Sequence, residues 1–231
     1  MKHTPVSWVT RAALVLRLGI VATLLILTTG TAQAGSHGPA HRAAWSAFPV
    51  ADGTVTDSDR DGRGDVLLDG ANSVVVGYNA LGPGEHRGVY EFDVRALPRL
   101  RDHDRLMLWL NQTGTRMDGT LPLVTLYAGQ GNGVLTAADF AAGRWAATFE
   151  SLGLGPDELG PDSGWYDNRI DVTQIVRRLT QRGARCVVFV IRPNPAAQAR
   201  QGALLLSSME TAAYSEQFVP ARLVLERRSH R

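Results

Sequence analysis

The sequence predicts an all-β fold: an antiparallel, jelly-roll-like β-sandwich with one short amphipathic helix near residues 172–182. From Trp45 onward, short apolar runs alternate with turn residues, which is typical of many short strands. The 231 residues include 24 glycines and 11 prolines, enough to supply the turns between such strands. Hydrophobic residues make up 44% and charged residues 20%, which is ordinary for a folded globular chain and excludes wholesale disorder.

Eight apolar runs are bounded by turn residues and are therefore predicted to be strands. Gly82-Pro83-Gly84 and Pro193-Asn194-Pro195 are two of the segments that separate them. The predicted strands are Ser73–Tyr78, Gly88–Val94, Arg105–Asn111, Leu121–Tyr127, Trp145–Phe149, Cys186–Arg192, Ala203–Ser208 and Arg222–Glu226.

The segment Val172–Arg182 has the apolar spacing of a helix. Its apolar stripe, at i, i+3, i+4 and i+7, consists of Val172, Ile175, Val176 and Leu179. Asp171 is placed to cap the start, with Gln174 three residues later, and Gly183 supplies the stop. A shorter helical turn is predicted at Thr136–Ala142, with Thr136 as its cap.

The first 34 residues have the features of a secretory signal peptide. Lys2, Arg11 and Arg17 supply the positive start, Leu18–Leu27 is an apolar run, and Ala32-Gln33-Ala34 offers a cleavage site. The apolar run is short for a membrane-spanning helix, which needs about 20 residues. A secreted or periplasmic protein without a stable membrane anchor is therefore expected, and an uncleaved anchor is the alternative.

The rest of the chain predicts a flexible linker over residues 35–44, a single β-sandwich domain over 45–226 and a basic tail over 227–231. The whole chain has 24 Lys and Arg against 22 Asp and Glu. Three basic residues leave with the signal, so 21 basic and 22 acidic residues remain, a net charge of −1. That balance gives no electrostatic footprint for nucleic acid, and no nucleic-acid partner is expected.

An aspartate-rich loop follows the linker region and predicts a cation site. Asp57, Asp59 and Asp61 alternate and precede Gly62, the pattern by which a short loop wraps oxygen ligands around calcium. Counting from Asp57, the backbone carbonyl of Arg63 is at position 7 and Asp65 at position 9.

The acidic residue expected at position 12 of that loop is missing. Leu68 stands there, with Asp69 one step late, so the pattern is nearer to shortened extracellular calcium loops than to a full EF-hand. The metal site predicted from sequence is Asp57, Asp59, Asp61, Arg63 and Asp65, with calcium as the cofactor. The alternative is a solvated polar turn whose acids are neutralised by Arg60 and Arg63.

The sequence lacks the motifs of common enzymes, and no catalytic residues are predicted. It has no G-x-S-x-G, H-E-x-x-H or C-x-x-C pattern, and Lys2 is its only lysine. Carboxylates for a glycosidase are present, but nothing in the sequence selects a pair. Cys186, the only cysteine, opens an apolar run and is predicted to be a buried structural thiol.

Aromatic residues indicate a ligand-binding surface. Trp165-Tyr166 lies in a Gly-, Pro- and Asp-rich segment and is predicted to form an exposed platform on which sugar rings stack. The alternative is a pair that folds down onto the core. Trp109, within Leu-Met-Leu-Trp-Leu, is predicted to lie in the core.

Three segments resemble the DNRLRE-type (disaggregatase-related) secreted β-sandwich modules. Arg87–Pro98 is similar to their R-x-x-x-x-F-D-[LV]-x-x-L-P opening, and Asp171–Val176 to their D-V-T-x-x-V helix start. The runs Val187–Arg192, Ala203–Glu210 and Pro220–Leu225 resemble their closing strands, so the likeness covers roughly residues 50–226. It implies an extracellular, carbohydrate-binding type of module that is not an enzyme.

These observations together lead to one hypothesis and two alternatives. The hypothesis is a secreted, non-catalytic β-sandwich that binds polysaccharide or cell-surface glycan and carries one structural calcium ion. The first alternative is a structural protein that assembles with itself in the extracellular matrix. The second is a hydrolase that uses a carboxylate pair.

Overall fold

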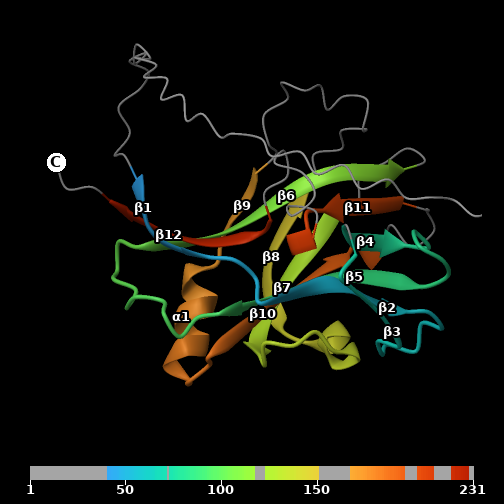
Figure 1. Cartoon of the computed structure of the whole chain (residues 1–231), viewed down its shortest axis with the longest axis horizontal. Helices are drawn as coiled ribbons and strands as arrows, with labels where there is room; N and C mark the ends of the chain where they lie inside the picture. Colours follow the sequence, from blue (N-terminus) through green and yellow to red (C-terminus); the bar gives the residue numbers. More distant parts are fainter. Residues whose placement is uncertain are drawn as a thin grey trace, which may run out of the picture. The chain divides into compact units, whose positions relative to one another are not determined.

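The computed structural model describes residues 41–71, 73–117, 123–150, 167–195, 202–210 and 220–228. All of them belong to one unit, Gly38–Arg231. Most of the described residues are in strands (Figure 1). The strands are β1 His41–Ala47, β2 Ala51–Asp57, β3 Val66–Asp69, β4 Val74–Tyr78, β5 Glu85–Asp93, β6 Arg105–Met117, β7 Leu123–Gly131, β8 Arg144–Glu150, β9 Asp167–Asp171, β10 Cys186–Pro193, β11 Gly202–Leu206 and β12 Arg222–Arg228.

The strands form one continuous antiparallel sheet that curls around its core. Its order is β1-β12-β6-β11-β4-β5-β10-β7-β8, with β2 and β3 attached at β5 and with β9 on β6. The long strand β6 takes part in three pairings: Arg105–Trp109 pairs with β12, Met107–Asn111 pairs with β9, and Gln112–Met117 pairs with β11. The predicted class, an all-β fold with one short helix, is confirmed for the described part of the chain.

All eight predicted strands are present, as β4 to β8 and β10 to β12. Four strands were not predicted from the sequence: β1, β2, β3 and β9. Two expected boundaries also differ from the structure. Residues 41–44, expected in the linker, begin β1, and Arg227 and Arg228, expected in the tail, end β12. These two ends pair with each other, Arg42 opposite Arg227, so hydrogen bonding between strands extends the domain beyond its apolar residues.

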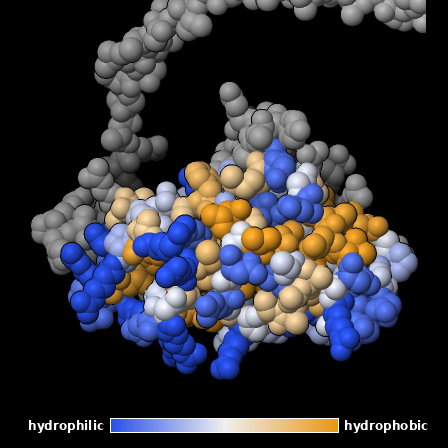
Figure 2. All heavy atoms as spheres, turned by 60° about the horizontal axis from the view of Figure 1, so that its bottom comes forward, coloured by the Kyte–Doolittle hydropathy of each residue, from blue (hydrophilic) through white to orange (hydrophobic). Residues whose placement is uncertain are grey.

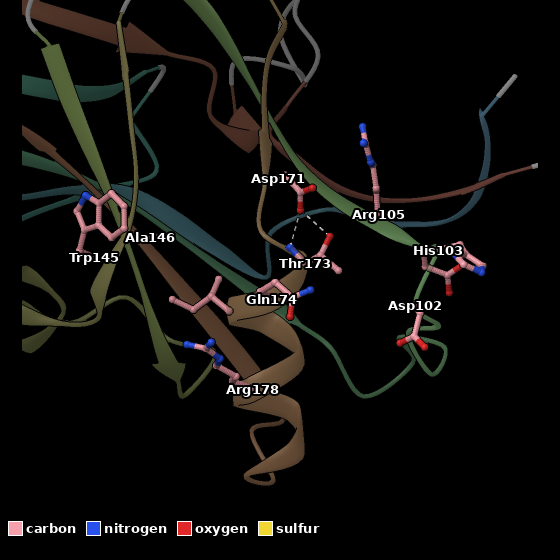
Figure 3. Close-up of a pocket in the computed structure, with 11 residues that line it drawn as sticks. Asp102, His103, Arg105, Trp145, Ala146, Asp171, Thr173, Gln174 and Arg178 are labelled. Carbon is pink, nitrogen blue, oxygen red and sulfur yellow. Dashed lines mark hydrogen bonds between the residues drawn. The ribbon is translucent and has the colours of Figure 1, made fainter. Parts of the chain in front are cut away.

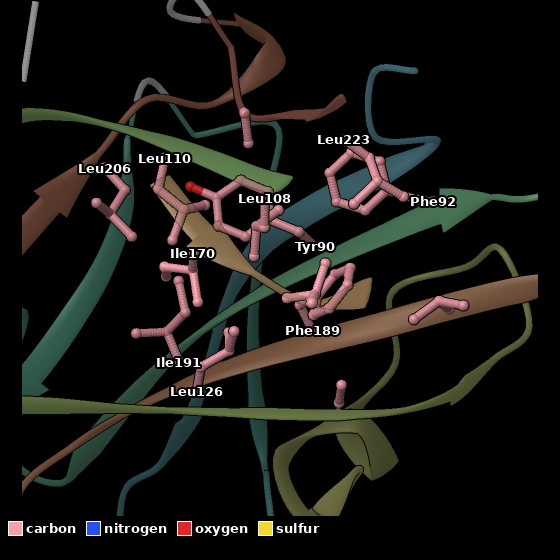
Figure 4. Packing of buried hydrophobic residues seen from close by; sticks show 14 of the residues in the cluster. Tyr90, Phe92, Leu108, Leu110, Leu126, Ile170, Phe189, Ile191, Leu206 and Leu223 are labelled. Atoms are coloured by element: carbon pink, nitrogen blue, oxygen red, sulfur yellow. The ribbon is translucent and has the colours of Figure 1, made fainter. Parts of the chain in front are cut away.

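The main core lies between two facing parts of the curled sheet. Leu108 and Leu223 come from β6 and β12, and face Phe92 and Phe189 from β5 and β10 (Figure 4). The rings of Phe92 and Phe189 meet edge to face, with centroids 5.8 Å apart and an interplanar angle of 73°. Because alternate residues of a strand point to opposite faces, Val188 and Val190 of β10 enter a second cluster on the other face of the sheet.

Trp109 does not lie in the core, contrary to the prediction from its apolar neighbours. It is half-buried, and it lies under two guanidinium groups, at 4.3 Å from Arg169 and 5.3 Å from Arg222 to the ring centroid. Leu108 and Leu110, on either side of it, are fully buried in the core. The period-two alternation of the strand therefore directs the tryptophan away from the core.

The one α-helix of the described residues, α1 Thr173–Gln181, is held at the end of β9. The N-cap is Val172, which makes no side-chain capping bond, so the predicted cap Asp171 lies one residue before it. One Asp171 carboxylate oxygen accepts hydrogen bonds from the Thr173 backbone N–H (2.9 Å) and hydroxyl (2.6 Å) and so holds the first residue of the helix. The Thr173 hydroxyl in turn accepts a bond from the Leu106 N–H of β6 (2.8 Å). Gly183 follows the helix with φ +87°, the left-handed conformation expected of a stop residue.

The predicted short helical turn is the 3₁₀-helix η1, Ala137–Ala141. Its N-cap is Thr136, as predicted, and the Asp139 carboxylate accepts the Thr136 N–H at 2.6 Å. Among the described residues, no helix has both the length and the apolar character needed to cross a membrane. On the face shown in Figure 2, hydrophobic side chains reach the surface between hydrophilic ones.

Candidate functional site

The aspartate-rich loop joins β2 to β3 and brings three carboxylates together. Asp57, the last residue of β2, is 2% exposed, whereas Asp59 and Asp61 are exposed. One oxygen atom from each of the three carboxylates lies within 4.8 Å of the others. This cluster could hold a metal ion, and its all-oxygen donor set fits a hard cation.

Backbone bonds to the aspartates give the loop its curl. The Gly62 N–H donates to Asp57 Oδ2 at 2.8 Å, and the Asp61 N–H donates to Asp57 Oδ1 at 3.1 Å. Gly62 has φ +89° and Arg60 has φ +63°, so the chain turns sharply twice within the motif. Gly62 thus occupies position 6 of the loop with the conformation for which glycine is needed there.

The loop is fixed against the turn between β4 and β5. Arg60 donates from Nη2 to Asn79 Oδ1 at 2.8 Å, and the same oxygen accepts the Gly84 N–H at 3.2 Å. A Cβ on Gly84 would lie 2.3 Å from the carbonyl oxygen of Asp57. The close approach at Gly84 allows this turn to support the buried first aspartate of the cluster.

The two other residues of the predicted metal set lie differently. Asp65 is not among the three clustered carboxylates, because it accepts hydrogen bonds from the hydroxyl (2.5 Å) and N–H (3.2 Å) of Ser58. The bond from the Ser58 hydroxyl holds the pKa of Asp65 below its usual value. Arg63 donates its N–H to Asp61 Oδ1 at 2.8 Å, and so helps to orient a member of the cluster.

A second feature is a polar cleft of about 620 Å³ beside the start of α1 (Figure 3), here named the Trp145 cleft. Trp145, at the beginning of β8, is 63% exposed and forms its aromatic wall. The cleft is lined by Asp102, His103, Asp104 and Arg105 before and at the start of β6, Trp145 and Ala146 of β8, and Asp171, Thr173, Gln174, Ile175 and Arg178 around α1.

The acids of the Trp145 cleft already have partners. Asp104 is buried, accepts the Arg101 N–H at 2.9 Å, and lies 3.5 Å from Arg227 Nε. Asp102 lies 3.8 Å from Arg177 Nη1, and Asp171 is bonded to Thr173.

Whereas the acids of the Trp145 cleft have partners, the two arginines that line it have no charged partner among the described residues. Arg105 and Arg178 are exposed and form no ion pair within the described part of the chain. Two exposed guanidinium groups and an exposed indole ring therefore line the cleft.

A third feature is a cleft of about 370 Å³ at the opening of β2. It is lined by Asp52, Asp69 and Glu210, and by apolar side chains that include Val134 and Met209. Asp52 is 3% exposed and accepts the Met209 N–H at 2.9 Å. Burial raises the pKa of Asp52 to about 7, and the charges of Glu210 and Asp69 add to this, while the Met209 bond opposes it.

Gly131, the last residue of β7, and Gly133, which follows the strand, pack around a buried carboxylate. The Gly133 N–H donates to Glu91 Oε2, and a Cβ on Gly131 would lie 2.6 Å from the same oxygen. Glu91 is fully buried, and burial raises its pKa. A larger residue at Gly131 would collide with the Glu91 carboxylate, so the packing around Glu91 explains why glycine stands there.

Trp165 and Tyr166, the predicted sugar platform, lie outside the described residues. The aromatic wall that the structure presents is Trp145, which the sequence assigned only to a strand. One local signal was available: Trp145 stands at the beginning of its predicted strand, next to Gly143-Arg144, where side chains are often exposed.

Comparison with protein-family models finds no match, and comparison with curated proteins finds none either.

Proposed function

We propose that this protein is a secreted, non-catalytic module that binds polysaccharide in the Trp145 cleft. The observation that carries the proposal is the exposed indole ring of Trp145 beside hydrogen-bonding side chains such as Gln174 and Arg178. A sugar ring has apolar C–H faces that stack on an aromatic ring, and hydroxyl groups around its edge that need polar partners. The cleft supplies both kinds of contact within one hollow.

We propose further that the cation held by Asp57, Asp59 and Asp61 is calcium, and that its role is structural. Carboxylate oxygens on a loop with glycine at position 6 are the ligands that calcium favours. The loop is fixed to the turn at Asn79 and Gly84, so an ion bound there would tie β2 and β3 to that turn. Its ligands do not line the Trp145 cleft.

Export is supported by the N-terminal sequence, with its positive start, apolar run and small-residue cleavage site. The resemblance to the secreted DNRLRE-type modules supports the same setting. Extracellular fluid holds enough calcium to fill sites of modest affinity, which suits a loop that has three clustered acids and no acid at position 12.

A glycan array tests the proposed function. The labelled protein is applied to the array in buffer with calcium and again with a chelator. Binding to a distinct group of glycans in calcium is the expected result. An array that stays at background in both buffers would reject polysaccharide binding.

The cleft at the opening of β2, which Asp52 lines, favours a second candidate function, that of a carboxylate-dependent hydrolase. An acid with a pKa of about 7 is protonated in a large fraction of molecules at neutral pH and could donate a proton to a leaving group, and Glu210 lines the same cleft. The test is release of reducing ends from the glycans that bind the protein on the array. Release that Asp52→Asn abolishes would establish the hydrolase, and no release by the unchanged protein would reject it.

A further inference from the structure

We infer that the polysaccharide bound in the Trp145 cleft is built from acidic sugars, whose anionic groups bind Arg178 while a neighbouring ring stacks on Trp145. The inference rests on the proposed function and adds the chemical class of the ligand. It follows from which charges in the cleft are already paired and which are not.

The charges of the cleft favour an anion. Asp104 lies beside Arg227, and Asp102 lies beside Arg177, so two of the three acids have a cationic neighbour. Asp171, the third acid, is bonded to the first residue of α1. The guanidinium groups of Arg105 and Arg178 have no acidic partner among the described residues.

The position of Arg178 makes it the better placed of the two arginines. It lies one helical turn after Gln174 on α1, and it is on the Trp145 side of the helix in Figure 3, whereas Arg105 and His103 lie on the other side. An acidic sugar stacked on Trp145 would therefore have a guanidinium group within the same cleft.

The strength of its hydrogen bonds also makes Arg178 a better partner for an acidic sugar than for a neutral one. A guanidinium group forms two parallel hydrogen bonds with a carboxylate, and such charge-assisted bonds are stronger than bonds to neutral hydroxyl groups. A carboxylate and a sulfate share this chemistry, so the anion class is inferred and the test distinguishes its two sources.

Isothermal titration with matched tetrasaccharides tests the inference. The probes are a galacturonate tetramer, the same tetramer as its neutral methyl ester, and a carrageenan tetramer, which carries sulfate and no carboxylate. The variants are Arg178→Gln and, as a matched control, Arg182→Gln, which removes the same charge from an exposed position of the chain that does not line the cleft. Both replaced side chains are exposed, and equal unfolding temperatures check that each variant folds.

The expected result is tighter binding of an acidic tetramer than of the neutral ester. Arg178→Gln should weaken binding of the acidic probe by roughly ten- to hundredfold, the range for one charge-assisted hydrogen bond. The same variant should leave the ester unchanged, and Arg182→Gln should leave both unchanged. Preference for galacturonate identifies a carboxylate ligand, and preference for the carrageenan tetramer identifies a sulfate.

Three outcomes overturn the inference, and they differ in what they mean for the proposed function. If the neutral ester or other neutral glycans bind as tightly as the acidic probes, the ligand class is wrong while polysaccharide binding stands. If Arg178→Gln and Arg182→Gln weaken binding of the acidic probe equally, the ligand class is likewise wrong while polysaccharide binding stands. If no acidic probe binds and the glycan array is also blank, both the inference and the proposed function fail.

Discussion

Single residues decide whether the aspartate-rich loop can hold a cation. Asp57 is buried at the end of β2, and it fixes the loop by accepting two backbone N–H bonds. Asp59 and Asp61 reach the same point from exposed positions. An ion there would be held by one rigid ligand and two adjustable ones.

Asp59→Ala is expected to remove the stabilisation that calcium gives. A ligand that binds only the folded state at about 100 times its Kd adds about 2.7 kcal/mol, which for a domain of this size corresponds to roughly 5–10 °C in Tm. Thermal unfolding in excess calcium and in chelator measures the difference. Asp69→Ala, an exposed aspartate outside the cluster, is the control that keeps the shift. If the wild-type protein has the same Tm in calcium and in chelator, the loop binds no calcium and is only a solvated turn.

Two glycines near the loop should respond differently to alanine. At Gly62 an added Cβ meets nothing within 4 Å, so Gly62→Ala costs only the strain of φ +89°, about 1–2 kcal/mol. At Gly84, with φ +123°, the Cβ would also meet the carbonyl of Asp57 at 2.3 Å, so the cost should be clearly larger. Urea unfolding of both variants without calcium compares them, and an equal loss would contradict the packing of the loop against the turn.

Asp52 should make stability depend on pH. Its pKa is about 7 in the folded state against an ordinary value of 3.8, so the folded state holds more protons between those values. Stability from this group is therefore complete below about pH 4 and is lost as the pH rises to about 7. Asp52→Asn cannot ionise, and its Tm should exceed that of the unchanged protein by several degrees at pH 8. The difference in Tm between the two proteins should become smaller as the pH falls. A difference that does not change with pH would contradict a carboxyl group that is buried and protonated.

At the scale of elements, the attachment of α1 to β6 forms one wall of the Trp145 cleft. The Thr173 hydroxyl accepts the Leu106 N–H and donates to Asp171, so one side chain joins the helix, β6 and β9. The Val172 N–H adds a bond to the Leu106 carbonyl at 2.9 Å. The cleft depends on this junction because its lining comes from both sides of it.

Thr173→Val should destabilise the fold by about 1–3 kcal/mol, because it leaves the buried Leu106 N–H without its acceptor and removes one of the two bonds to Asp171 Oδ1, which keeps the backbone N–H of residue 173. Thr180→Val is the matched control. The Thr180 hydroxyl bonds only to carbonyls of its own helix, so its loss should cost less than about 1 kcal/mol. Chemical unfolding gives both values, and similar losses would show that the junction contributes little.

The elements also show how far sequence reasoning reaches. The strands with uninterrupted apolar residues, such as β10, were predictable because they are buried on both faces. β2 (Ala-Asp-Gly-Thr-Val-Thr-Asp) and β9 (Asp-Asn-Arg-Ile-Asp) are polar in sequence and become strands through pairing with β5 and β6. That pairing is a tertiary effect, and no local pattern contains it.

The aspartate cluster and the Trp145 cleft also differ in how far the sequence predicts them. The three clustered aspartates were predictable because Asp-x-Asp-x-Asp-Gly is a local motif whose spacing alone brings the oxygens together. The Trp145 cleft could not be predicted from the sequence, because its lining comes from three segments, around residues 102–105, 145–146 and 171–178. Only the curl of the sheet and the position of α1 bring those segments to one place.

At the scale of the described unit, one antiparallel sheet supports two separate features. The strands β6 and β12 face β5 and β10 across a core of fully buried side chains, among them Phe92, Phe189 and Leu223 (Figure 4). The aspartate-rich loop extends from β2, and the Trp145 cleft is lined by residues of β6, β8 and α1. Loss of calcium should therefore lower stability without removing the ligand contacts at Trp145.

The glycan affinity of Trp145→Ala tests the central claim most directly. The variant is titrated with the glycan that gives the strongest signal for the unchanged protein on the array. Phe48→Ala, which removes an aromatic ring that is 48% exposed and does not line the cleft, is the control. Loss of a stacked ring should weaken binding by at least about tenfold in Trp145→Ala and leave Phe48→Ala unchanged. Full affinity in a folded Trp145→Ala protein would contradict the claim that the Trp145 cleft binds polysaccharide.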